Sequence, residues 1–243
     1  MSNYIYSKDV HNLKSPRQIV PLVLKTDSIK SVLDVGTGIG TWLKVFQEEG
    51  IVDVIGIDSE SVAVDQLCIS AENFLAINLS NEFNLNRKFD IAICLEVAEH
   101  LPQESADALV ASLVKHSDLI LFSAAIPNQG GQDHINEQWP IYWQEKFMKY
   151  GYYFEDDIRA KVWDNIEVDW WYKQNIFTIR KGNSQPLVPM LSLVHPDLFD
   201  LAIRIHIQFK TDLSKGRIGL RVVAIGFVKA LTRKIRSLLR LGV

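Results

Sequence analysis

Four residues between positions 34 and 40 have the types and spacing of a loop that binds a small ligand. Gly36, Gly38 and Gly40 alternate with other residues, two positions after the acidic side chain of Asp34. Glycine adopts positive φ at no steric cost, and a ligand can approach its backbone closely because it has no Cβ. Segment 31–42 (SVLDVGTGIGTW) therefore predicts a nucleotide-cofactor loop, at a turn from a buried strand to a helix.

The acidic residue favours one class of cofactor over another. The spacing G-x-G-x-G departs from the G-x-G-x-x-G of dinucleotide sites. A carboxylate at Asp34 would repel a pyrophosphate, whereas it would pair with an ammonium group such as that of S-adenosylmethionine. Asp58, at the end of the next apolar run, can accept hydrogen bonds from both ribose hydroxyls, but NAD would use the same acid. An NAD-dependent oxidoreductase is therefore the alternative, and Asp34 and the glycine spacing argue against it.

A second polar group lies in the loop NQGGQDHINEQW, which includes Asp133 and His134. An imidazole titrates near pH ~6.5 and is largely a free base at neutral pH, so His134 is the candidate general base that removes a proton from an acceptor hydroxyl. Asp133 would orient it; alternatively, His134 only anchors the loop. In a variant mechanism Asp133 would instead help to hold a divalent metal near two acceptor hydroxyls, but no second ligand is evident, so no metal site is expected. His100 is expected to be mainly structural.

The order of motifs resembles that of class I S-adenosylmethionine-dependent methyltransferases. D-x-G-x-G-x-G is followed by G-x-D ending at Asp58, a polar residue ending the third strand at Asn78, and FD-x-x-x-C-LEVAEHLP, so that the resemblance spans residues 31–122. Two later blocks, AAIPNQGGQDHINEQWPIYW (124–143) and DWWYKQN (169–175), are similar to a bacterial subgroup associated with surface-glycan biosynthesis.

The resemblance implies a role for each matching residue, with S-adenosylhomocysteine as the product. Asp34 would hold the methionine amino group, Gly36, Thr37, Gly38 and Gly40 would pass under the methionyl and ribose portions, Asp58 and Ser59 would hold the ribose, Asn78 and Leu79 would edge the adenine, and Glu96 would lie near the methionine end. Two positions depart from the family pattern. Asn78 stands where an acid is more frequent, and its carbonyl can accept the same hydrogen bond. Thr37 stands where cysteine is commoner.

The elements that must position these residues follow from the alternation of apolar patterns. A helix is expected over 16–24, strands near residues 33, 55, 76, 92 and 120, and helical patterns in the gaps, including 106–114. A further helix is expected over 141–150, and 174–180 alternates like an antiparallel edge strand. With the resemblance, this predicts a Rossmann-like methyltransferase fold: an α/β protein with a mostly parallel seven-stranded sheet and helices on both faces. Because ligands bind at the carboxyl ends of parallel strands, the polar residues should converge there.

Charge divides the chain into two expected parts. Residues 201–243 contain ten Lys or Arg and one acid, a net charge of +9, which leaves −12 for residues 1–200. We expect a methyltransferase domain over 1–182, with an acceptor-loop region at 124–175, and a basic, partly amphipathic helical extension over 183–243. On a helical wheel, Lys229, Arg233, Arg236 and Arg240 oppose Phe227, Val228, Leu231, Ile235 and Leu238.

This extension suggests partners. Segment 218–243 has the pattern of an interfacial helix, so peripheral membrane contact is one expectation. The alternatives are packing on the acidic domain or on a second copy of the chain, which would give a homo-oligomer. Nucleic acid is not expected as a partner, because the acidic catalytic portion would repel phosphate.

Composition favours a cytoplasmic location, with contact at the inner face of the membrane through the extension. The first 14 residues carry no apolar signal region, and no run reaches the ~18 apolar residues of a membrane span. Cys68 and Cys94 cannot form a disulfide framework, and both are expected to be buried thiols.

Together these features predict O-methylation of a sugar hydroxyl on a glycan or glycan precursor. The flat faces of Trp139, Trp143 and the run 170–172 would suit sugar rings. One alternative is a small-molecule hydroxyl or amine as acceptor. Another, of a different class, is a non-catalytic, cofactor-binding scaffold in a membrane-associated glycan-assembly complex.

Overall fold

The computed structural model describes residues 11–182 and 191–240, and it gives the backbone alone for Arg221, Ala230 and 233–240. The chain forms two compact units, residues 1–195 and 196–243, and each is described by itself. The domain boundary predicted after residue 182 adjoins residues 183–190, which lie outside the described part of the chain.

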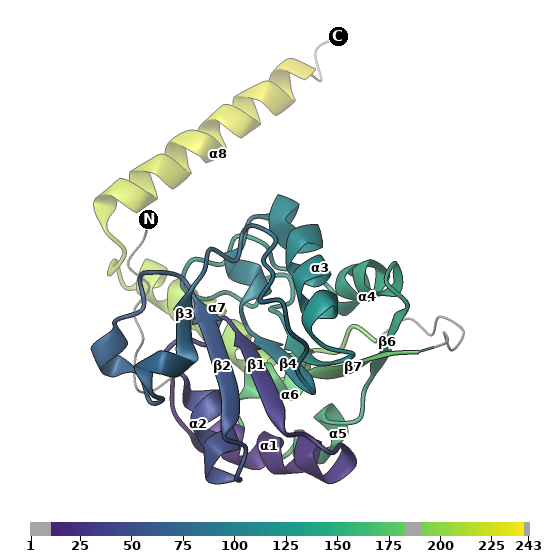
Figure 1. The fold of residues 1–243 in the computed structure, drawn as a ribbon. Coiled ribbons are helices and arrows are strands. Elements are labelled where there is room, and N and C mark those ends of the chain that lie inside the picture. Colours follow the sequence, from purple (N-terminus) through teal and green to yellow (C-terminus); the bar gives the residue numbers. More distant parts are fainter. Residues whose placement is uncertain (1–10, 183–190, 241–243) are drawn as a thin grey trace. The chain divides into compact units, whose positions relative to one another are not determined.

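The first unit alternates strands and helices, as the apolar patterns predicted (Figure 1). Its strands are β1 (Ser31–Val35), β2 (Asp53–Asp58), β3 (Phe74–Ala76), β4 (Ile91–Leu95), β5 (Leu119–Ser123), β6 (Tyr152–Glu155) and β7 (Phe177–Lys181). Its α-helices are α1 (Lys14–Thr26), α2 (Thr41–Glu48), α3 (Ala106–His116), α4 (Pro140–Met148), α5 (Arg159–Val162) and α6 (Trp170–Asn175). Four short 3-10 turns complete it: η1 (Val64–Gln66), η2 (Ala71–Asn73), η3 (Ala98–His100) and η4 (Gln103–Ser105).

The seven strands form one sheet in the order β3-β2-β1-β4-β5-β7-β6. All neighbours pair in parallel except those of β7, which pairs antiparallel with both β5 and β6. The Rossmann-like methyltransferase fold is confirmed. The placement of 174–180 at the edge was wrong: β7 lies inside the sheet, and β6, which the sequence analysis did not identify, forms the edge.

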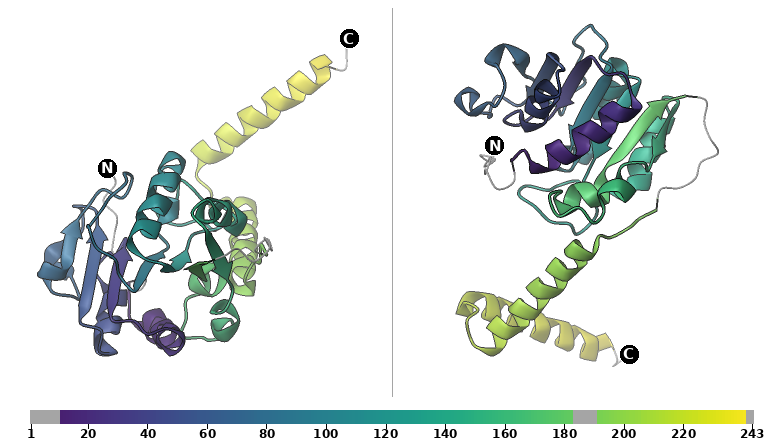
Figure 2. Two further views of the ribbon diagram at one scale, coloured as in Figure 1. Left: turned by 45° about the vertical axis from the view of Figure 1, so that its right-hand side comes forward. Right: turned by 90° about the horizontal axis from the view of Figure 1, so that it is seen from below.

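Both faces of the sheet are covered, because successive side chains of the buried strands point to opposite sides. In β5, Ile120 and Phe122 pack with α3 and α4, whereas Leu119 and Leu121 pack with α1, α2 and α5. Figure 2 shows these helices on the two sides of the strands. The near-continuous apolar sequence of β1, β4 and β5 is thus the signature of strands buried on both faces.

Three sequence expectations fail locally. The gaps between β2, β3 and β4 hold short 3-10 turns or irregular chain in place of the expected α-helices. Cys68 is exposed, although Cys94 is buried in β4 as expected. The helix expected over 141–150 ends at Met148, so Tyr150 lies beyond it and is exposed.

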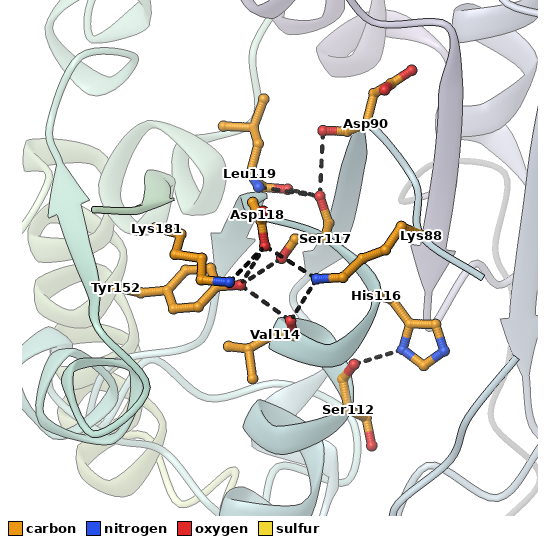
Figure 3. Close-up of polar contacts among 10 residues, drawn as sticks. All are labelled: Lys88, Asp90, Ser112, Val114, His116, Ser117, Asp118, Leu119, Tyr152 and Lys181. Atoms are coloured by element: carbon orange, nitrogen blue, oxygen red, sulfur yellow. Dashed lines mark hydrogen bonds and ion pairs between the residues drawn. The ribbon is translucent and has the colours of Figure 1, made fainter. Parts of the chain in front are cut away.

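Polar contacts close the amino-terminal end of the sheet between β5, β6 and β7 (Figure 3). The hydroxyl of Tyr152 donates to the carbonyl of Ser117 at 2.8 Å. The Asp118 carboxylate pairs with Lys88 at 3.1 Å and with Lys181 at 3.4 Å. Burial raises the pKa of Tyr152, so the phenol stays a donor. These contacts tie the start of β6 and the end of β7 to the segment before β5.

The second unit consists of α7 (Pro196–Ser214) and α8 (Leu220–Arg240). Of the predicted wheel of α8, the side chains at 233–240 lie outside the described residues. Among the residues that the structure describes, no helix combines the length and apolar character needed to cross a bilayer.

Candidate functional site

The glycine turn lies between β1 and α2 and rests against the end of β2. Gly36, Gly38 and Gly40 have φ of +83°, +53° and +82°. The N–H of Gly36 donates to the carbonyl of Ile57 at 2.8 Å. A Cβ added at Gly36 would stand 2.3 Å from a methyl carbon of Val97, so this position requires glycine both for its backbone and for its space.

Two carboxylates flank this turn. Asp34, at 3% exposure, accepts a hydrogen bond from the Thr37 hydroxyl at 2.8 Å. Asp58 accepts the backbone N–H of Gly38 at 2.7 Å and that of Ser59 at 2.6 Å. The acid at the end of β2 therefore fixes the middle of the glycine turn, and each of its oxygens retains a second lone pair for a ligand.

The carboxylates of Asp34 and Asp58 lack a counter-charge. Within the described part of the chain, neither forms an ion pair with a lysine or arginine. Burial raises the pKa of Asp34 to about 7, the Thr37 hydroxyl opposes this shift, and the charge of Asp58 adds to it. Burial also raises the pKa of Asp58. A buried carboxylate of this kind suits a ligand that carries a positive charge.

Asn78 and Leu79 follow β3 on the same side of the sheet. The N–H of Ile77 donates to the carbonyl of Asp58 at 2.7 Å, which ties this segment to the end of β2. The side-chain carbonyl of Asn78 accepts the N–H of Ser80 at 3.0 Å in a local turn. The Leu79 side chain, at 6% exposure, belongs to the hydrophobic core.

Glu96 occupies a strained position after β4, with φ of +54°. Its N–H is held by the carbonyl and hydroxyl of Ser123, at 3.1 and 3.0 Å. Its carboxylate accepts the side-chain amides of Gln129 at 2.9 Å and Asn175 at 3.1 Å. Burial raises the pKa of Glu96, and these amides oppose the shift. Sequence analysis missed the roles of Gln129 and Asn175, although both lie in the two later blocks that carried the resemblance.

Beside Glu96, three further side chains with ligating atoms meet. The ligating atoms of Glu99, His100 and His134 all lie within 4.8 Å of one another. The two imidazoles cross edge to face with centroids 4.9 Å apart. Burial and the charge of Glu96 raise the pKa of Glu99 well above its usual value, whereas burial lowers the pKa of His100 to about 4. The sequence argument found no second metal-ligating residue in the loop; the structure brings three such residues together from two segments.

His134 reaches this cluster because its loop docks on the turn η3 through the backbone. The N–H groups of Ile135 and Asn136 both donate to the carbonyl of Glu99, at 2.9 and 3.0 Å. The side-chain amide of Asn136 donates to the carbonyl of Ala98 at 3.3 Å. These bonds fix His134 beside Glu99 although 35 positions separate the two residues.

The carboxylate of Glu137 contacts His134 in the way that was expected of Asp133. Nδ1 of His134 lies 3.1 Å from an oxygen of Glu137. The same carboxylate accepts the N–H groups of Asn128 and Gly130, each at 2.7 Å. A carboxylate that only accepts leaves Nδ1 of His134 as the donor and Nε2 as the atom with the lone pair. Asp133 is exposed, and its backbone is left-handed, with φ of +59°.

The aromatic side chains that remain exposed are not all those that were expected to contact a sugar. Trp143 is 2% exposed and packs on Phe122 with centroids 5.3 Å apart, so it belongs to the core and offers no face to a ligand. Trp139 is 37% exposed. Trp170 and Trp171 are half-buried on α6, and Tyr172 packs edge to face on Trp42. The faces that remain for an acceptor are those of Trp139, Trp170 and Trp171.

Comparison with known proteins agrees with this geometry. Residues 9–179 match the family described as methyltransferase domain. The chain is also similar to a ribosomal protein L11 methyltransferase of Fusobacterium nucleatum subsp. nucleatum, with 29% identity over 121 residues. That match covers 45% of this chain and 36% of the relative, so the chain spans about a third of that protein's length.

Two solved structures share the fold. DesVI of Streptomyces venezuelae superposes with a TM-score of 0.55 at 16% identity, covering 74% of this chain and 100% of that one. Magnesium protoporphyrin IX methyltransferase of Synechocystis PCC 6803, with bound S-adenosylhomocysteine, gives a TM-score of 0.52 at 17% identity. It covers 75% of this chain and 90% of that one.

Proposed function

Because the chain belongs to the methyltransferase domain family, we propose that it transfers a methyl group from S-adenosylmethionine to a hydroxyl group of its acceptor. The observation that carries this proposal is the buried Asp34 carboxylate, which stands at the start of the glycine turn and forms no ion pair with any lysine or arginine in the part of the chain that the structure describes. S-adenosylmethionine carries an ammonium group that would neutralise it. NAD brings a pyrophosphate instead, which this carboxylate would repel.

The residues at the carboxyl ends of the strands would each contact a different part of the cofactor. Asp34 would hold the ammonium group, and Asp58 would accept the ribose hydroxyls with the lone pairs left by Gly38 and Ser59. The backbone of 36–40 would lie under the methionyl and ribose portions. The side-chain carbonyl of Asn78 would accept a hydrogen bond from the adenine amino group through its remaining lone pair.

The acceptor hydroxyl would approach the cluster of Glu99, His100 and His134 on the side where loop 126–138 lies. When bound, S-adenosylmethionine supplies a methyl group whose bond to sulfur breaks, with its electron pair passing to sulfur, as the acceptor oxygen bonds to the carbon. Nε2 of His134 would take the hydroxyl proton, and Glu137 would stabilise the imidazolium through Nδ1. Glu137 would take the orienting role toward His134 that was expected of Asp133.

For the acceptor we propose a sugar hydroxyl on a glycan or glycan precursor. The partly exposed indoles of Trp139, Trp170 and Trp171 support this choice, because sugar rings stack on flat apolar faces with polar edges. A small-molecule hydroxyl or amine is the second candidate acceptor. A scaffold that binds the cofactor without turnover would be distinguished by its indifference to His134→Ala.

Calorimetric titration with S-adenosylmethionine, S-adenosylhomocysteine and NAD in parallel tests the proposal. Binding of both adenosyl compounds without NAD is the expected result, and it justifies an acceptor screen that begins with nucleotide sugars and glycans. Binding of NAD alone, or of none of the three, would refute the assignment of the cofactor.

We also propose that segment 218–243 contacts an anionic membrane surface from the cytoplasmic side. Apolar residues on both helices of the second unit are exposed: Phe199, Ile203, Ile205, Ile207, Phe209, Leu213, Leu220, Val222, Val223, Ile225, Phe227, Val228 and Leu231. The net charge of +9 over 201–243 complements anionic headgroups. A second copy of the chain is the competing partner for these faces.

A further inference from the structure

Glu99, His100 and His134 form a set of one carboxylate and two imidazoles around a common point, with ligating atoms within 4.8 Å of one another. In tetrahedral zinc sites with bonds of about 2.0 to 2.1 Å, neighbouring ligand atoms stand about 3.3 Å apart. Metal binding would therefore require the three side chains to rotate toward the common point. Two imidazoles with one carboxylate favour zinc, iron or cobalt, whereas magnesium and calcium prefer oxygen ligands alone.

We propose that these three residues bind a divalent transition-metal ion, with zinc as the reference ion. The first supporting observation is the state of Glu99. Glu99 is 0% exposed, and among the residues that the structure describes neither of its carboxylate oxygens has a hydrogen-bond partner. Buried carboxylates in proteins are normally paired or bound to metals, and a cation at the common point would meet this requirement.

The surroundings of His134 are the second supporting observation. Metal-binding histidines usually donate their other ring N–H to a carboxylate, which fixes the ring and its tautomer. Glu137 contacts Nδ1 of His134 in this way and is itself held by two backbone N–H groups. Nε2 is thereby left as the ligating atom.

Gly131 leaves the space that the imidazole of His134 occupies in the proposed metal site. A Cβ built on Gly131 would stand 2.2 Å from Nε2 of His134 and 2.5 Å from Cε1, so any side chain there would push the imidazole away. The φ of Gly131 is not positive, so alanine is acceptable to its backbone. Gly131→Ala therefore disturbs the site without removing a ligand.

The ion would extend the proposed function, and only its catalytic consequence rests on that function. With the ion bound, Nε2 of His134 is a ligand and no longer a base. The ion would then have an open position for the acceptor hydroxyl, lowering its pKa so that its proton passes to solvent water. His134 would serve transfer in either state, through different chemistry.

Equilibrium dialysis of the untagged full chain against Zn²⁺, with no cofactor or acceptor present, tests the site. We expect about one equivalent bound, at least 100-fold weaker binding in Glu99→Gln, His100→Gln and His134→Gln, and a 10- to 100-fold loss in Glu137→Gln. His206→Gln removes an exposed histidine on α7 and is the matched control. Replacing Zn²⁺ with Co²⁺ gives a visible absorption band that reports nitrogen and oxygen ligation, and Gly131→Ala should alter it.

Unchanged stoichiometry and affinity in His134→Gln and Glu99→Gln, or no Zn²⁺ bound by the parent chain, would overturn the proposal. Far-ultraviolet circular dichroism and S-adenosylmethionine titration show whether each variant is folded, since none of them alters the glycine turn. Because the dialysis contains no cofactor, loss of the metal proposal and loss of the proposed function are separate outcomes.

Discussion

Replacing Asp34 with asparagine should stabilise the ligand-free protein at pH values above about 4 and at the same time weaken its binding of S-adenosylmethionine. Burial raises the pKa of Asp34 from 3.8 to about 7. Because the folded state holds the proton more tightly than the unfolded chain, the free energy of unfolding falls as the pH rises between about 4 and 7. At about 1.4 kcal/mol per pKa unit, the total loss is about 4 kcal/mol.

Asparagine has no proton to lose, and its carbonyl can still accept the Thr37 hydroxyl. Asp34→Asn should therefore match the parent near pH 4 and exceed it by up to about 4 kcal/mol at pH 8. Urea unfolding of the ligand-free chain at several pH values measures this difference. Asp65→Asn, which removes an exposed carboxylate from the same unit, controls for the loss of a negative charge as such.

The same variant should lose cofactor affinity. The parent chain should bind S-adenosylmethionine about tenfold more tightly per pH unit between pH 5 and 7, because Asp34 must be ionised to pair with the ammonium group. Asp34→Asn should bind roughly 100-fold more weakly at pH 8, without this pH dependence. A variant less stable than the parent at pH 8, or one that keeps the pH-dependent affinity, would refute the electrostatic reasoning.

Three other changes test the remaining assignments. Asp58→Ala should weaken S-adenosylmethionine binding by about 10- to 100-fold in calorimetry, because its carboxylate contacts the ribose and also holds Gly38; equal binding would contradict this. His134→Ala should lower turnover by roughly 100-fold or more with cofactor affinity nearly unchanged, and intact turnover would reduce His134 to a loop anchor. Changing Lys229, Arg233, Arg236 and Arg240 to glutamine should weaken sedimentation with anionic vesicles by about 1 kcal/mol per charge, and an unaltered affinity would favour a second copy of the chain as the partner.

The fold was predictable from the sequence because its central strands are buried on both faces and therefore stand out as apolar runs. β6 escaped because Tyr152–Glu155 is a short edge strand with an alternating burial pattern, directly after a turn at Gly151 with positive φ. Its two tyrosines and phenylalanine were indistinguishable in sequence from the neighbouring aromatic residues, of which Trp143 belongs to the core.

The positions of the candidate cofactor residues were also accessible from sequence, since they lie at or just beyond the carboxyl ends of strands, and these ends converge in a parallel sheet. The cluster of Glu99, His100 and His134 was not accessible in this way. Its formation depends on two backbone hydrogen bonds to the carbonyl of Glu99, and main-chain groups carry no sequence signal. Adjacency favoured Asp133 as the partner of His134, whereas the structure places an oxygen of Glu137 3.1 Å from Nδ1 of His134.

The loop that carries His134 is held by main-chain atoms. The position of His134 therefore does not depend on the loop side chains that would contact an acceptor. The N–H groups of Ile135 and Asn136 supply the anchoring bonds whatever side chains these positions carry. Exposed positions such as 132, 133 and 135 can therefore change in the course of evolution without moving the imidazole. Substitutions at the loop surface would therefore leave the imidazole of His134 beside Glu99.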